Sequence, residues 1–262
     1  MRLRATPAIP AALLFLGTSL SACTGNAGTP AASTATAPAT VEAGYVTGIA
    51  VDTQGKPLAG AKILLENAMF HASYIKGTTQ ADGRYRLKVQ PGVWTPQASL
   101  RKDYNGQSFG LELAPDNPDS VDDDGAVRNF TWKLEGRAPD NGYRYYGGFI
   151  QLSAGLDLDS DLSDVELTLT PSGPLIDGSE GRTLHLHYGD HYWVDRFQIE
   201  DVPIGRYIVT ATQKTETGAQ RPLRIQDWYT HGDGEFMREY QLDFKPESVA
   251  GNGATASIVI GN

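Results

Sequence analysis

Two runs of aspartate are the residues whose type and spacing point most directly to chemistry. Residues 157–164 contain four closely spaced carboxylates, Asp157, Asp159, Asp161 and Asp164. Carboxylates grouped in this way can converge on calcium, which takes about six to eight oxygen ligands. The run departs from an EF-hand loop, because Leu162 replaces the required glycine and Thr168 stands where a bidentate glutamate belongs. A solvated acidic loop between strands is the alternative, and both interpretations also apply to residues 116–124.

Three histidines are the candidates for a transition-metal site, namely His185, His187 and His191. If this segment is a strand, the first two side chains share one face, and the third can return from the following turn to complete a three-nitrogen zinc site. The same alternation turns Leu184 and Leu186 inward and leaves the histidines facing water. Solvent-facing histidines are the simpler interpretation.

Aromatic residues provide a third candidate site, because the C–H faces of sugar rings pack well on aromatic surfaces. The candidate ligand-binding residues are Tyr145, Trp193 and Trp228. Packing between neighbouring β-sandwiches is the alternative use for the tyrosines at residues 143–146. A polysaccharide is therefore one candidate partner, and another protein of the cell envelope is a second.

Common catalytic motifs are absent from the sequence. It contains no His-Glu-x-x-His, no Gly-x-Ser-x-Gly and no glycine-rich phosphate loop. Its single cysteine, Cys23, is expected to carry lipid rather than to act as a nucleophile. We therefore expect a protein that is not an enzyme and that has no cofactor, with calcium as the open exception. Carboxylates that act on sugars are the enzymatic alternative.

The N-terminus predicts export and attachment to a membrane. Arg2 and Arg4 precede an apolar run at residues 11–16, which is typical of a signal peptide. The sequence Leu20-Ser21-Ala22-Cys23 resembles a bacterial lipobox, with cleavage before Cys23 and lipid on its sulfur and new amino group. An ordinary signal peptide is the alternative. Several acyl chains on one residue suffice for stable anchoring to a membrane. The residue after the cysteine is Thr24 and not an aspartate, which implies sorting to the outer membrane.

Composition supports an exported β-sheet protein. The 262 residues include 29 glycines and 15 prolines, which suits short strands joined by turns. A lone cysteine excludes an intrachain disulfide. The net charge of −9 argues against nucleic acid as a partner.

Alternating side chains predict the strands. After a turn at Asp82-Gly83, residues 84–89 alternate between apolar and charged side chains, and residues 61–66 do the same. Asp-Gly suits a tight hairpin turn, because both residues tolerate a positive φ.

The glycines and turn residues of this region resemble those of the carboxypeptidase regulatory-like domain. The matching residues are Gly48-x-x-x-Asp52-x-x-Gly55-x-Pro57-Leu58-x-Gly60-Ala61, Thr78-Thr79-x-x-Asp82-Gly83-x-Tyr85 and Val89-x-Pro91-Gly92. The resemblance implies a transthyretin-like Greek-key β-sandwich over about residues 45–135. It carries over no catalytic residue, because members of that family are non-catalytic modules, and related sandwiches bind starch.

A second β-sandwich is predicted from a partial repeat of this pattern. Gly148 follows Gly48 by 100 positions, and residues 197–207 repeat the order of strand, proline turn, glycine and aromatic strand. We predict an all-β fold of two tandem Greek-key β-sandwiches, with one large sandwich as the alternative. The expected divisions are a lipoprotein signal peptide at 1–22, the lipidated cysteine and a flexible linker at 23–44, the carboxypeptidase regulatory-like sandwich at 45–135 and a second, divergent sandwich at 136–262. The predicted function is a non-catalytic, lipid-anchored binding or structural protein of the cell envelope, with polysaccharide binding as the alternative.

Overall fold

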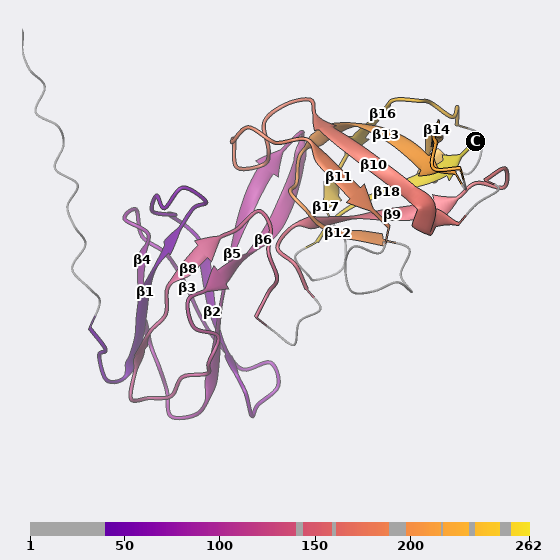
Figure 1. Cartoon of the computed structure of the whole chain (residues 1–262). Coiled ribbons are helices and arrows are strands. Elements are labelled where there is room, and N and C mark those ends of the chain that lie inside the picture. The colour runs from indigo at the N-terminus through magenta and orange to yellow at the C-terminus, as the bar shows by residue number, and fades with distance from the viewer. Residues whose placement is uncertain are drawn as a thin grey trace, which may run out of the picture. The chain divides into compact units, whose positions relative to one another are not determined.

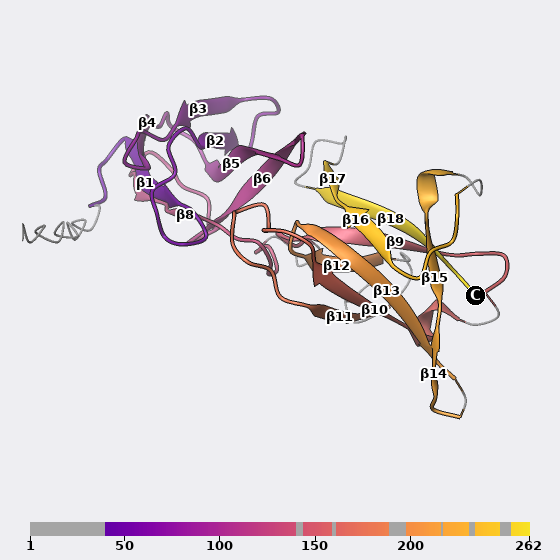
Figure 2. The same cartoon turned by 90° about the horizontal axis from the view of Figure 1, so that it is seen from above.

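The computed structural model describes residues 40–139, 144–158, 161–188, 198–215, 217–230, 234–246 and 253–262 (Figures 1 and 2). These residues belong to one compact unit, Ala39–Asn262. Their regular structure consists of strands and two short 3₁₀ turns, η1 (Leu162–Asp164) and η3 (Trp228–Thr230). The predicted all-β fold class is therefore confirmed.

Residues 45–132 form an eight-stranded sheet with the order β3-β2-β5-β6-β8-β1-β4, in which β7 also pairs with β1. Its strands are β1 (Tyr45–Val51), β2 (Lys62–Asn67), β3 (Tyr74–Thr78), β4 (Arg84–Lys88), β5 (Trp94–Tyr104), β6 (Gln107–Pro115), β7 (Ala126–Val127) and β8 (Phe130–Trp132). The expected alternation holds in β2, where Ile63 and Leu65 are buried and Lys62 is exposed. A strand with one buried face packs its apolar side chains on the core, and its polar side chains face water.

The turn at Asp82-Gly83 forms as predicted, but it closes no hairpin. Gly83 has a φ of +75°, and a Cβ atom there would lie 2.6 Å from the backbone oxygen of Ala50. The turn leads into β4, yet β4 pairs with β1, whereas β3 pairs with β2. The prediction of a hairpin was wrong because turn chemistry specifies the local reversal of the chain, and tertiary packing selects the partner strand.

Residues 148–261 form two five-stranded sheets. One has the order β11-β10-β13-β14 with β16 paired to β13, and the other has the order β12-β9-β18-β15 with β17 paired to β18. The strands are β9 (Gly148–Ala154), β10 (Val165–Pro171), β11 (Leu184–His187), β12 (Gln198–Val202), β13 (Arg206–Lys214), β14 (Gln220–Pro222), β15 (Arg224–Asp227), β16 (Tyr240–Asp243), β17 (Lys245–Pro246) and β18 (Ala254–Gly261).

The same strand pairing occurs in both parts of the chain. β1 lies between the antiparallel β4 and the parallel β8, and β9 lies between the antiparallel β12 and the parallel β18. Likewise, β2 lies between β3 and β5, and β10 lies between β11 and β13. Gly48 and Gly148 both occupy crowded positions, because a Cβ atom would overlap Arg128 in the first case and Phe244 in the second.

One buried tyrosine in each part donates a hydrogen bond to a nearby backbone oxygen. The Tyr85 hydroxyl donates to Arg128 O at 2.7 Å, and the Tyr207 hydroxyl donates to Pro203 O at 2.7 Å. Burial raises the pKa of both phenols well above the usual value, because the charged form would lose its hydration. Both side chains therefore remain neutral donors within the core.

The strand β12 departs from simple alternation. Its register with β9 shifts between Ile199 and Val202, and Asp201 adopts a φ of +60°, which is uncommon for a residue with a side chain. The Asp201 carboxylate accepts hydrogen bonds from the backbone N–H groups of Gly136 at 2.8 Å and Gly147 at 3.2 Å. This bulge therefore directs a carboxylate to the backbone that precedes β9.

Candidate binding sites

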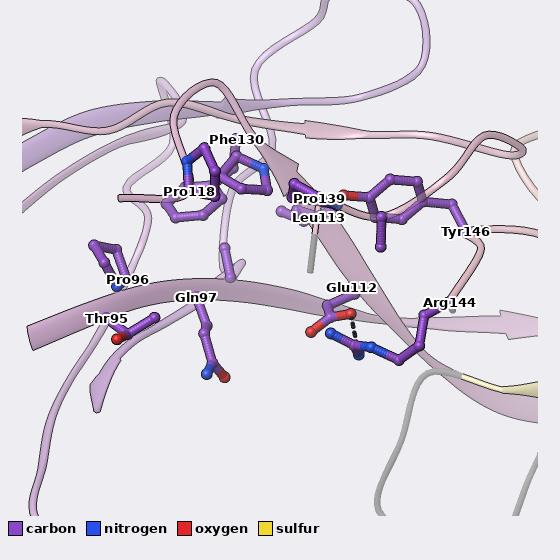
Figure 3. Close-up of a pocket in the computed structure, with 13 residues that line it drawn as sticks. Thr95, Pro96, Gln97, Glu112, Leu113, Pro118, Phe130, Pro139, Arg144 and Tyr146 are labelled. Atoms are coloured by element: carbon purple, nitrogen blue, oxygen red, sulfur yellow. Dashed lines mark hydrogen bonds and ion pairs between the residues drawn. The ribbon is translucent and has the colours of Figure 1, made fainter. Parts of the chain in front are cut away.

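The first candidate site is a cavity of about 310 Å³ beside β5 and β6 (Figure 3). This volume lies at the lower end of the range of about 300–1,000 Å³ for small-ligand pockets. The cavity is lined by Thr95, Pro96, Gln97, Ala98, Glu112, Leu113, Pro115, Pro118, Phe130, Ala138, Pro139, Arg144 and Tyr146. Most of the lining comes from β5 and β6, and pairing of β5 with β2 and of β6 with β8 holds these residues in place.

An ion pair lies at the polar side of this cavity. Arg144 Nη1 lies 2.8 Å from Glu112 Oε2, and Figure 3 shows the two side chains facing each other. Their side chains are 51% and 23% exposed, so solvent still reaches the arginine. A charge-assisted hydrogen bond of this kind holds its donor and acceptor in fixed directions. A ligand would therefore meet a prearranged carboxylate and guanidinium.

Prolines and aromatic rings form the apolar side of the cavity. Pro118, Phe130, Pro139 and Tyr146 all line it, and Figure 3 labels them. The backbone N–H of Tyr146 donates to Gly136 O at 2.9 Å, which holds this residue close to the sheet. Polar and apolar groups thus share the lining, and placed polar groups beside an apolar surface can fix the orientation of a ligand.

The lining offers no obvious catalytic pair among the residues that the structure describes. Of the lining residues within the described ranges, Glu112 is the one carboxylate, and none is a histidine or cysteine. The Thr95 hydroxyl is 3.2 Å from the Ser120 hydroxyl and is not held by a base. The arrangement can orient a ligand through hydrogen bonds, charge and apolar contact.

The second candidate site is a cavity of about 500 Å³ around Trp228. Its lining is mainly apolar and consists of Ala154, Gly155, Leu156, Asp157, Gln226, Trp228, Phe236 and Val259. Trp228 is 42% exposed at the edge of this cavity, where η3 follows β15. An exposed indole beside an open apolar cavity suits a flat ligand with C–H groups.

Two of the predicted calcium ligands, Asp157 and Asp161, accept hydrogen bonds from backbone N–H groups. Asp161 caps η1 by accepting from the backbone N–H of Ser163 at 3.0 Å, and Asp157 Oδ2 accepts from the Asn262 N–H at 3.3 Å. Asp164 is the last residue of η1, and Asp159 lies outside the described residues. Within the ranges that the structure describes, no group of three or more His, Cys, Asp and Glu side chains is placed to hold a metal ion.

Two of the three predicted histidines, His185 and His187, face water. His185 and His187 have side chains that are 64% and 52% exposed, and both approach Glu166 across the β10–β11 pair. His185 Nδ1 is 3.3 Å from Glu166 Oε1, and His187 Nε2 is 3.8 Å from Glu166 Oε2. His191, the third histidine of the predicted zinc site, lies outside the described residues.

The structure places the predicted sugar-binding aromatics at separate locations. Tyr145 forms an isolated bridge with Arg137 and lies between two residues of the first cavity, Arg144 and Tyr146. Trp228 lines the second cavity, and Trp193 lies outside the described residues. Tyr145 and Trp228 therefore do not share a cavity, and Trp228 is the better placed of the two for stacking.

Cys23, the predicted lipid attachment site, also lies outside the described residues. In the part of the chain that the structure covers, no helix has the length and hydropathy needed to cross a membrane.

Comparison with known proteins gives only distant structural similarities. No protein-family model matches the chain, and no curated protein matches it. The chain is similar to the TIE protein of Bacillus anthracis, with 15% identity, a TM-score of 0.27 and coverage of 83% of this chain and 33% of that one. It is also similar to a streptococcal ancillary pilin, with 14% identity, a TM-score of 0.25 and coverage of 81% and 62%.

A third similar structure is the major pilin subunit of Bacillus cereus, with 10% identity, a TM-score of 0.22 and coverage of 84% of this chain and 100% of that one. The chain thus spans about a third of the TIE protein chain and about three fifths of the ancillary pilin.

Proposed function

We propose that this protein is a lipid-anchored, non-catalytic binding protein of the bacterial cell envelope. The observation that carries the proposal is the first cavity, whose lining combines prolines and two aromatic rings with the Glu112–Arg144 ion pair. The proposed lipid anchor is inferred from the lipobox-like residues 20–23. Outer-membrane attachment is part of the proposal and follows from Thr24.

The architecture within this proposal is a tandem pair of transthyretin-like sandwiches, the first of the carboxypeptidase regulatory-like type. The turn-residue spacing of residues 48–92 supports the family assignment. The recurrent pairing around β1 and β9 supports the tandem arrangement. Such sandwiches act as rigid platforms on which a binding site is formed.

Metabolic labelling with radioactive palmitate tests the anchor. The full chain is expected to incorporate the label in a bacterial host, and Cys23→Ala is expected to lose it and to remain an unprocessed precursor. Equal incorporation in both proteins would contradict the assignment of Cys23.

The cavity is tested by saturation-transfer NMR on residues 39–262 with maltotriose, chitotriose and a proline-rich hexapeptide as probes. We expect the affinity for a probe, measured from this transfer, to fall about two- to tenfold in Tyr146→Ala, because an aromatic contact contributes about 0.5–1.5 kcal/mol beyond its buried area. Tyr145→Ala is the matched control, since this neighbouring tyrosine is not part of the lining. Equal transfer in both variants would show that binding occurs elsewhere.

Polysaccharide binding is the second candidate function, and the exposed Trp228 at the second cavity favours it. Affinity electrophoresis through gels that contain starch, xylan or laminarin measures this directly. Retardation is expected to disappear in Trp228→Ala and to persist in Tyr229→Ala. Tyr229 is similarly exposed, at 47%, but lies outside the cavity lining. Unchanged mobility of the unmodified protein in every gel would exclude this function for those polymers.

A further inference from the structure

The loop between β2 and β3 exposes two large apolar side chains next to each other. Met69 is 77% exposed and Phe70 is 69% exposed, although each would gain free energy by leaving water. Val93, which is 44% exposed, lies beside this loop because Ala68 N–H donates to Val93 O at 2.9 Å. We name Met69, Phe70 and Val93 the apolar tip.

This exposure is built into the loop by its hydrogen bonds. Asn67 is buried, and its side-chain oxygen accepts from the N–H groups of Met69 at 2.9 Å and Phe70 at 3.0 Å. The Asn67 N–H donates across the loop to Ser73 O at 2.9 Å. An asparagine that bonds the following backbone groups fixes a tight turn. The two apolar side chains are therefore held outward by a defined conformation.

The apolar tip lies at the end of the sheet where the preceding chain enters. Gly44 O accepts from the Val89 N–H at 2.9 Å, and the turn that follows Val89 leads directly to Val93. The opposite end of β1 continues into the turn that contains Gln54. The predicted lipid on Cys23 is thus connected to the fold at the same end as the apolar tip.

We propose that the apolar tip inserts into the interfacial region of the membrane that holds the lipid anchor. This inference rests on the proposed lipid anchor. A flexible segment of about 20 residues has a typical end-to-end distance of about 25 Å. The anchor therefore keeps the tip at a high effective concentration near the bilayer, where even weak insertion becomes populated. Phenylalanine and methionine side chains gain free energy there by leaving water.

Charge at this end selects the kind of lipid. Asp122, Asp123 and Asp124 are exposed in the loop next to Gly44, whose N–H donates to Asp123 O at 2.8 Å. Glu42 is paired with Arg86, and His71 and Lys88 are the exposed basic side chains near the tip. The acidic loop is repelled by anionic headgroups. The tip therefore inserts into zwitterionic lipid, and anionic lipid opposes it at low ionic strength.

The test uses the full lipoprotein with an environment-sensitive fluorophore on a new cysteine. His71→Cys places the fluorophore beside the intact tip, and Gln54→Cys places it at the other end as the control. Lipidation blocks Cys23, so each protein has one reactive thiol. The proteins are reconstituted into phosphatidylcholine vesicles, and quenching by spin-labelled lipids reports the depth of the fluorophore.

The expected result is strong quenching at position 71 and none at position 54. Replacing both Met69 and Phe70 with serine in the His71→Cys protein is expected to lower the ratio of inserted to free tip at least about tenfold, a factor that corresponds to about 1.4 kcal/mol. Vesicles that contain phosphatidylglycerol are expected to show less quenching at low salt, with recovery at high salt.

The experiment distinguishes failure of the lipid anchor from failure of the apolar tip to insert. Flotation of the Gln54→Cys protein with the vesicles reports the anchor alone, so loss of flotation refutes the proposed anchoring. Flotation with equal quenching at positions 71 and 54 refutes insertion and leaves the anchor intact. Quenching at position 71 that survives the double serine substitution also refutes the role of the apolar tip.

Discussion

The two buried tyrosines provide a direct test of how the fold is divided and stabilised. In Tyr85→Phe and Tyr207→Phe, the ring remains in place, but Arg128 O or Pro203 O loses its hydrogen-bond donor. A buried polar group left without its partner costs about 1–3 kcal/mol. Tyr207→Phe is expected to cost more, because Pro203 is itself buried whereas Arg128 is half-buried.

The temperature shift then depends on the size of the cooperative unit. If residues 45–135 and 136–262 unfold as separate domains, 1 kcal/mol lowers the Tm of the affected domain by about 4–8 °C. Each variant then shifts one calorimetric transition and leaves the other unchanged. If the described unit unfolds as a whole, the same loss shifts a single transition by about 2–4 °C in both variants.

The assay is differential scanning calorimetry of residues 39–262, with Tyr74→Phe as the control. Tyr74 is 41% exposed, so removing its hydroxyl is expected to change the free energy of unfolding by less than about 0.5 kcal/mol. Tm shifts in Tyr85→Phe and Tyr207→Phe no larger than this control would refute the hydrogen-bond argument. A single transition that both variants shift would instead refute the division into two domains.

Two further predictions concern carboxylates. Burial raises the pKa of Asp177, but hydrogen bonds from Ser179 and Thr53 outweigh burial, so the net pKa lies below its usual 3.8. Asp177→Asn should therefore lower stability at pH 7, and the difference from the unmodified protein should shrink as the pH falls through the lowered pKa. Urea denaturation at several pH values measures this, and a difference that does not shrink as the pH falls below 3.8 would contradict it. Millimolar calcium is expected to leave the Tm of residues 39–262 unchanged, and stabilisation that grows with calcium concentration would restore the calcium hypothesis.

Strand positions and buried faces could be predicted from the sequence, because alternation is a local property. Tyr85, Trp94 and Trp132 are buried as their strands require. Gly48 lies within β1 and Gly148 begins β9, and neighbouring atoms leave no room for a Cβ atom at either position. The partner of β4 was not predictable in this way, because strand pairing depends on packing between residues far apart in sequence.

The cavities were missed for a related reason. Pro96, Glu112 and Arg144 have no shared local pattern, and they meet only because β5 pairs with β6 and the chain after β8 returns to the same place. The available signal was the number of prolines within and after these strands, since proline within a sheet is expected only at edges, strand ends or bulges. Trp228 was a candidate because an aromatic ring can stack on a sugar, a property of the residue type that needs no knowledge of the fold.

The abundance of aspartate is better explained by turns than by metal binding. Asp52, Asp82, Asp122 and Asp161 each accept a hydrogen bond from the backbone N–H two residues further on. Aspartate is favoured in turns because its short side chain can bond the backbone in this way. A chain with many short strands needs many such turns, so acidic runs accumulate in its loops. The acidic charge of this protein is then a consequence of its β architecture, and it in turn restricts the lipid surfaces that the apolar tip can approach.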